Sequence, residues 1–251
     1  MRNKFIAAVA AAMLAAVAVP AVAAERPLSY TWFEAGYAQT EVDGLDQVLG
    51  SDHLDGYDVN ISYGHDNGLI LFGSYGSTGK DLRYSDADID ARGDLDFDRF
   101  RVGIGYAFGI NERVDWVTRA AYENAKLGLS GSVDYLDEFG DPATGTLAGE
   151  IEAKGYSLET GLRGKLASRF EGYIGGGYVR SNDPTVSDIH IDGEVYEGGT
   201  IDLDGLGVDR SETYGAVGLK FDIAGSWSIV GRAMLTSDVN VYFVGLRSSL
   251  Y

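Results

Sequence analysis

The side chains that could carry catalysis in this 251-residue chain are few and scattered. It has no Cys, which excludes thiolate catalysis, Cys-ligated metals and disulfides. Of its three His, His53 and His190 fall in long acidic segments, where a base beside a carboxylate could form a hydrolase site, and His65 falls in a short turn. No spacing selects such a site. We therefore expect no catalytic residues, no cofactor and a non-enzymatic protein.

Two acidic runs could bind a divalent cation. Their carboxylates are two residues apart, on one side of an extended chain. The candidate ligands are Asp86, Asp88, Asp90, Asp202 and Asp204. Ca²⁺ accepts six to eight oxygens in irregular geometry, so weak binding there is one interpretation. The spacing is not that of an EF-hand, and unpatterned charge is usually a solvated surface, which is the favoured interpretation.

Other charged residues recur at every second position of apolar segments. Around residue 102, for example, Phe100, Val102 and Ile104 alternate with Arg99 and Arg101. Because strand side chains alternate between two faces and charge is costly against hydrocarbon, the apolar set is predicted to face lipid and the charged set a lumen. The predicted lumen charge network is Glu34, Arg101, Arg119, Glu123, Glu159, Arg163, Glu171, Lys220, Arg232 and Arg247. In a narrow bore these charges are expected to pair.

Ten segments with this period of two are predicted to be the strands that position these side chains. They are residues 30–39, 56–64, 69–77, 97–108, 114–126, 155–164, 169–179, 213–221, 227–236 and 240–250. An even number of such segments indicates an all-β, transmembrane, antiparallel up-and-down β-barrel. A soluble β-sandwich also alternates, but it does not explain charge opposite apolar parity on so many strands.

The start of the chain predicts export. Arg2 and Lys4 precede an apolar Ala/Val-rich stretch, and small residues before Glu25 suit a cleavage site. Residues 1–24 are thus predicted to be a cleaved Sec-type signal peptide and residues 25–251 a single barrel domain of the outer membrane. Its expected partners are outer-membrane lipid and lipopolysaccharide, periplasmic chaperones and the barrel assembly machinery.

Short and long connections alternate along the chain. Turns such as Asp66-Asn67-Gly68 are short, and the segments 40–53, 79–94, 128–150 and 181–211 are expected to be long extracellular loops. These four segments hold 22 acidic and 4 basic residues, against a formal net charge of −18 for the whole chain. Such loops should attract divalent cations and repel nucleic acid.

Aromatic residues near the strand ends are expected to form interfacial girdles: Tyr30, Phe108, Tyr122, Phe170, Tyr178, Phe221 and Trp227. Inward glycines are expected to leave some room in the lumen: Gly36, Gly103, Gly105, Gly161, Gly175 and Gly177.

Several strand motifs support a family resemblance. They include Glu34-Ala35-Gly36-Tyr37, the run from Phe100 to Tyr106, the run from Gly155 to Gly164, and the ending Phe243-Val244-Gly245-Leu246-Arg247. The chain resembles a family of small outer-membrane barrels of plant-associated gammaproteobacteria, once catalogued as an activator of a rice immune receptor and found with outer-membrane vesicles. The resemblance implies a membrane location, whereas the loops here are longer and more acidic.

Three functions follow as hypotheses. The first is a structural or surface- and vesicle-interaction barrel whose acidic loops meet cations, lipopolysaccharide or another cell. The second is a narrow passive pore that prefers cations because of those loops. The least favoured is an outer-membrane hydrolase.

Overall fold

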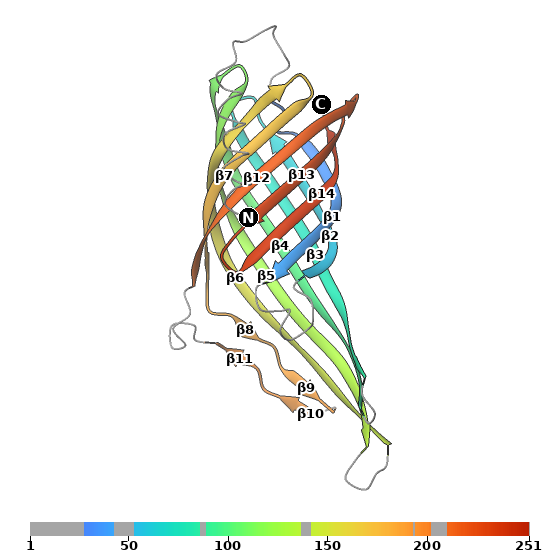
Figure 1. The fold of residues 1–251 in the computed structure, drawn as a ribbon. Coiled ribbons are helices and arrows are strands. Elements are labelled where there is room, and N and C mark those ends of the chain that lie inside the picture. The colour runs from blue at the N-terminus through green and yellow to red at the C-terminus, as the bar shows by residue number, and fades with distance from the viewer. Residues whose placement is uncertain are drawn as a thin grey trace.

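The computed structural model describes residues 28–42, 53–85, 89–136, 142–192, 194–201 and 210–250. Within them, ten antiparallel strands pair in sequence order and close into a barrel, because β1 pairs with β14 and β6 with β7 (Figure 1). The barrel strands are β1 (Trp32–Val42), β2 (His53–Gly64), β3 (Leu69–Ser85), β4 (Ile89–Asn111), β5 (Val114–Leu136), β6 (Pro142–Ala167), β7 (Phe170–Ser181), β12 (Ser211–Ala224), β13 (Trp227–Leu235) and β14 (Val239–Ser249). Closure gives the backbone of each strand a partner on both sides, as hydrocarbon requires. The predicted up-and-down barrel is confirmed.

The chain before residue 28, with the predicted signal peptide, lies outside the described residues. Among the residues that are described, no helix has the length and apolar character needed to cross a membrane.

The outer surface of the barrel is apolar, as the alternation predicts. Ile104 is 57% exposed and Val244 60%, although both are large hydrophobic residues inside strands. The predicted girdle residues Phe108, Phe170 and Trp227 are also exposed on this surface. An exposed apolar surface of this extent is stable only against lipid, so the architecture is that of an outer-membrane β-barrel.

Four strands are much longer than the sequence pattern predicts. β3 has 17 residues, β4 and β5 have 23 each, and β6 has 26. They continue together past the rest of the barrel (Figure 1). The expectation of loops at 79–94 and 128–150 was therefore wrong over most of both segments, because the paired ladder of hydrogen bonds continues without a register shift there. We call this extension, residues 79–85, 89–97, 125–136 and 142–153, the blade.

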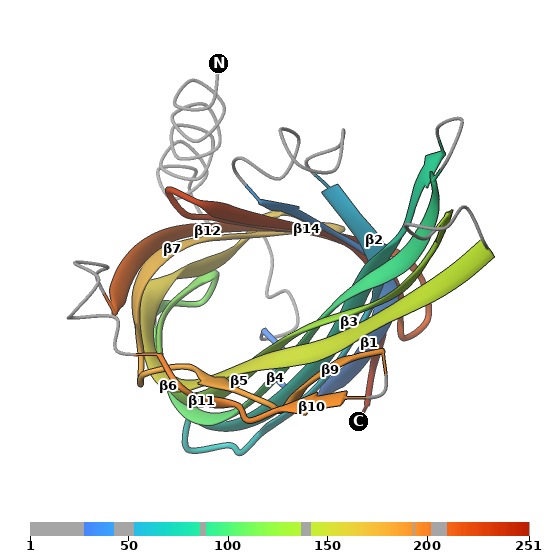
Figure 2. The same cartoon turned by 90° about the horizontal axis from the view of Figure 1, so that it is seen from below.

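The segment 181–211, expected as a loop, contains four short strands. They are β8 (Thr185–Val186), β9 (Ile189–Ile191), β10 (Glu194–Tyr196) and β11 (Gly199–Thr200). β8 and β9 pair with the outer part of β6, so this segment widens the blade at its β6 edge (Figures 1 and 2). Within the segment 40–53, residues 43–52 lie outside the described part of the chain.

The barrel interior is largely filled. Small and apolar side chains are buried towards the short-turn end, among them Ile70, Val117 and Val230, and others towards the long-connection end, among them Ala38 and Leu54. Charged side chains occupy the lumen between them. The core of this protein is thus the inside of the barrel, as expected for a narrow one.

Candidate functional site

The candidate site is the charged interior of the barrel. The structure places all ten residues of the predicted lumen charge network on the inward parity of their strands and brings every one of them into an ion pair. These pairs form three clusters, each built on glutamates that are almost fully enclosed.

The first cluster surrounds Glu34 on β1, which has no exposed surface. Arg247 Nη2 on β14 lies 2.7 Å from Glu34 Oε2, and Arg232 Nη2 on β13 lies 2.8 Å from Glu34 Oε1. The register makes the first contact, since Glu34 and Arg247 are direct cross-strand partners. Each guanidinium also stacks on an aromatic ring, Arg247 on Trp32 at 4.1 Å and Arg232 on Phe243 at 4.4 Å.

The second cluster surrounds Glu171 on β7. Arg163 Nη2 on β6 lies 2.6 Å from Glu171 Oε2, and Lys220 Nζ on β12 lies 2.6 Å from Glu171 Oε1. Lys220 also contacts Asp222 at 3.0 Å, nearer the strand end. Three neighbouring strands therefore meet through one carboxylate, in the charge-assisted geometry that makes such contacts strong.

The third cluster contains two glutamates and three arginines. Glu123 lies 2.6 Å from Arg99 and 3.2 Å from Arg101. Glu159 lies 2.9 Å from Arg119 and 3.8 Å from Arg101. Arg101 thus links the two carboxylates, and the cluster spans β4, β5 and β6.

Two tyrosines complete this cluster and were not anticipated. The hydroxyls of Tyr173 and Tyr214 donate to Glu159 at 2.8 and 3.1 Å. Sequence parity contains the signal, because Tyr173 lies two residues after Glu171 and Tyr214 six residues before Lys220, each on the inward face. Arg99 has inward parity as well, and its ion-pair partner Glu123 lies diagonally across from it on β5, directly opposite Arg101.

The space beside several inward glycines is occupied by aromatic rings. A Cβ on Gly177 would lie 2.3 Å from the Tyr214 ring, and one on Gly103 would lie 2.7 Å from the Phe72 ring. Arg101 and Arg119 stack on Phe72 in turn, at 5.3 and 5.8 Å. The expected room beside the glycines is therefore occupied in large part by aromatic side chains.

Tyr30, expected in an interfacial girdle, instead points into the barrel. Its hydroxyl donates to Asp115 at 2.7 Å, and the guanidinium of Arg163 lies 4.5 Å from its ring centre. Arg163 also donates to the carbonyl of Ser29 at 2.8 Å. Because Asp115 and Arg163 come from β5 and β6, far around the ring from β1, residues 28–31 reach across the short-turn end of the lumen.

A second candidate site is the blade, where the two faces of the sheet exchange character. On β5 the outward parity changes from Trp116 and Tyr122 to Lys126 and Ser130, and the inward parity changes from Glu123 to a leucine-rich row. β4 and β6 change in the same way. The apolar face of the blade is Leu82, Leu95, Leu127, Leu129, Val133, Leu147, Ile151 and Ile191. Polarity therefore inverts where the strands leave the hydrocarbon.

The polar face of the blade carries ordinary surface ion pairs. Lys126 contacts Glu150, and Lys154 contacts Glu152, each at 2.8 Å. Hydrogen bonds from Lys154 and then Asn124 lower the pKa of Glu152. Exposed pairs of this kind contribute little to stability, so this face is a solvated one.

The apolar face of the blade remains accessible. Leu129 is 39% exposed and Leu147 40%. With Leu82 and Val133 they line a shallow hollow of about 680 Å³. Side chains of this type in such numbers are unusual on a surface that meets water.

The candidate hydrolase residues do not come together. His53 is on β2, where it lies 3.8 Å from Asp55, and His190 is on β9, beyond the far edge of the blade. Three described strands, β3, β4 and β5, lie between β2 and β6, the strand that β9 joins. His65 lies in the turn between β2 and β3, where its carbonyl accepts from the Gly68 amide.

The candidate Ca²⁺ ligands are mostly untested by the structure. Asp86, Asp88, Asp202 and Asp204 lie outside the described residues, and Asp90 is placed on β4 opposite Ser85 by its backbone. Among the residues that are described, no group of three or more His, Asp or Glu side chains could hold a metal ion.

No family model matches the chain, and a search of curated proteins found no match. Among solved structures, it is similar to the attachment invasion locus protein Ail of Yersinia pestis, with 15% identity over 88% of this chain and 97% of that one and a TM-score of 0.39. It is also similar to the KdgM porin, with 13% identity over 87% and 99% and a TM-score of 0.36. For the outer-membrane protease OmpT of Escherichia coli the identity is 12% over 91% and 99%, with a TM-score of 0.48.

Proposed function

We propose that this chain is a non-enzymatic surface-interaction protein of the outer membrane, which contacts its partner through the apolar face of the blade. One observation carries the proposal: a paired sheet continues well beyond the lipid-facing surface and keeps leucines of the inward parity accessible where the chain meets water. A flexible loop with these leucines would fold so as to bury them, whereas a continuous hydrogen-bonded sheet keeps their side chains accessible.

The family resemblance adds a setting for this contact. If the chain shares the association of that family with outer-membrane vesicles, the blade would project from both cell and vesicle surfaces. A vesicle meeting a neighbouring cell would then present the apolar face at the point of contact. Lipopolysaccharide and divalent cations remain expected partners of the acidic polar face.

The test uses two adjacent exposed residues that point to opposite faces of β5. Leu129→Asp places a charge on the apolar face, and Ser130→Asp adds the same charge to the polar face. Labelled vesicles carrying each variant are mixed with cells that lack the protein, and bound vesicles are counted by flow cytometry. We expect Leu129→Asp to lose most of the attachment and Ser130→Asp to keep it.

Both variants must first show the heat-modified gel shift of a folded barrel. Equal attachment by wild type and Leu129→Asp would overturn the proposal. Equal loss in both variants would point instead to a charge effect unrelated to the apolar face.

A narrow pore is the second candidate. It is favoured by two adjoining cavities of about 110 and 150 Å³ inside the lumen. It is opposed by the ion pairs, aromatic rings and residues 28–31 that fill the rest of the bore.

A further inference from the structure

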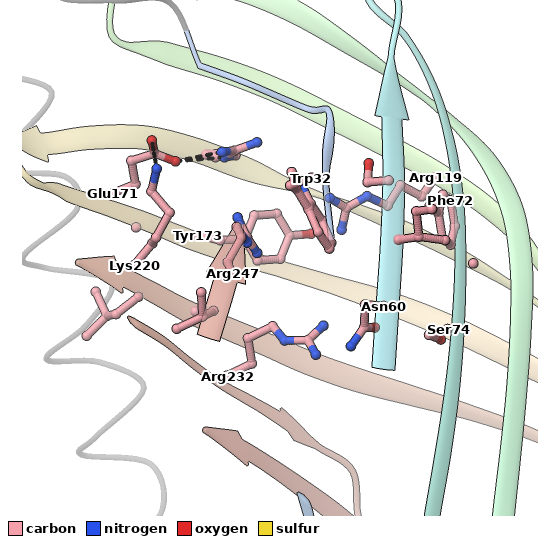
Figure 3. A pocket seen from close by; sticks show the side chains of 18 of the residues that line it. Trp32, Asn60, Phe72, Ser74, Arg119, Glu171, Tyr173, Lys220, Arg232 and Arg247 are labelled. Carbon is pink, nitrogen blue, oxygen red and sulfur yellow. Dashed lines mark hydrogen bonds and ion pairs between the residues drawn. The ribbon is translucent and has the colours of Figure 1, made fainter. Parts of the chain in front are cut away.

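We propose that the lumen contains a binding site for a small oxyanion, formed by Arg101, Arg119 and Arg232. The two adjoining lumen cavities have these three arginines in common, and Figure 3 shows Arg119 and Arg232 around the first of them. The other residues common to both linings are Asn60, Ser74 and Tyr173. With about 30 Å³ of liquid volume per water, each cavity has room for roughly four or five waters, or for one phosphate or carboxylate group.

The walls of these cavities are cationic. Their combined linings contain seven basic side chains and three acidic ones, Asp58, Glu159 and Glu171. Glu34 and Glu123, which complete the ion pairs, line neither cavity. Low-dielectric walls focus this excess of positive charge on the space between them.

The bases also face the cavity more openly than the acids do. The side chains of Arg232 and Arg119 are 34% and 21% exposed, whereas those of Glu34 and Glu159 are 0% and 6% exposed. The carboxylates of Glu34 and Glu159 therefore lie in the wall behind the guanidinium groups of Arg232 and Arg119. A solute in the cavity meets donors first.

Some of these donors have no acceptor. The Nε atoms of Arg119 and Arg232 are buried without a hydrogen-bond partner in the described part of the chain. Their Nη atoms contact Glu159 and Glu34, so the guanidinium groups are held in place while one edge stays unsatisfied. These Nε atoms have almost no accessible surface and do not reach the cavities, so a solute there meets the other guanidinium nitrogens, and an oxyanion can accept from several such donors at once. Phosphate and carboxylate groups share this chemistry.

The test measures binding of inorganic phosphate to the refolded, full-length barrel in detergent micelles, by isothermal titration calorimetry in a chloride-poor buffer. We expect saturable binding of one phosphate per chain. Arg232→Gln should weaken it at least tenfold. Lys126→Gln removes one positive charge from the polar face of the blade and should leave the affinity unchanged.

Arg232→Gln also removes a partner of Glu34, so a second variant covers the case in which it does not fold. Asn60→Asp keeps every basic residue and adds a carboxylate to the shared wall; it should also weaken phosphate at least tenfold. Absence of saturable binding to wild type, or equal weakening by Lys126→Gln, would overturn the site. Neither result would bear on the blade, because one experiment probes the lumen and the other the apolar face of the blade, which share no residue.

Discussion

At the scale of the residue, Glu34 is the charge on which the largest effect is expected. It is fully enclosed and holds Arg232 and Arg247 from two further strands. Glu34→Gln removes the compensating charge and leaves two guanidinium groups, of which that of Arg247 is enclosed, facing one neutral amide. Breaking an enclosed pair in this way costs about 3–5 kcal/mol, so the free energy of unfolding should fall by that order. Urea unfolding from lipid vesicles measures it.

The control for Glu34→Gln is Glu152→Gln on the polar face of the blade. Glu152 also has a lysine partner, Lys154 at 2.8 Å, but both side chains meet water. The unfolding midpoint of this variant should match that of wild type. A midpoint for Glu34→Gln that also matches wild type would show that the lumen pairs contribute no net stability.

At the scale of the element, the pairing of β7 with β12 depends on matching a glycine to a ring. Gly177 and Tyr214 are direct cross-strand partners, and the Tyr214 ring occupies the space that a side chain on residue 177 would need. Gly177→Ala should push Tyr214 away from Glu159 and destabilise the barrel by about 1–3 kcal/mol, as other overpacked sites do.

Gly215 on β12 provides the matched control for this substitution. It is adjacent to Tyr214, but a Cβ there would meet nothing within 4 Å. Gly215→Ala should therefore leave the unfolding midpoint in urea unchanged. Equal unfolding midpoints for both alanine variants would show that the absence of a side chain at Gly177 is not needed to place the Tyr214 ring.

At the scale of the whole molecule, the closed barrel raises the question of whether its lumen conducts ions. The lumen holds three ion-pair clusters, stacked rings and residues 28–31 across its short-turn end. We expect heat-modifiable protein in planar bilayers to show no stable unitary conductance. Stable channels would contradict the filled lumen, and their ion preference would then show whether the acidic exterior or the basic cavity walls dominate.

The sequence by itself determined the barrel, its strand order and the inward position of its charges, because a period of two and the cost of charge in lipid leave few alternatives. It could not determine how far β3, β4, β5 and β6 extend beyond the membrane. Beyond the membrane the outward positions become polar and the inward positions apolar. A prediction that assigns apolar positions to lipid therefore does not apply there.

Only the tertiary structure decided which charges meet and what fills the space between them. Arg101 joins Glu123 to Glu159, and Tyr214 fits over Gly177, because closure and strand register bring together side chains from strands far apart in the chain. Tyr30 shows the same limit of sequence reasoning. An aromatic residue near a strand end suits the lipid interface as well as the lumen, where the structure places it. The parity of a residue in its strand predicts which face its side chain is on. Which side chains touch on that face depends on how the barrel closes.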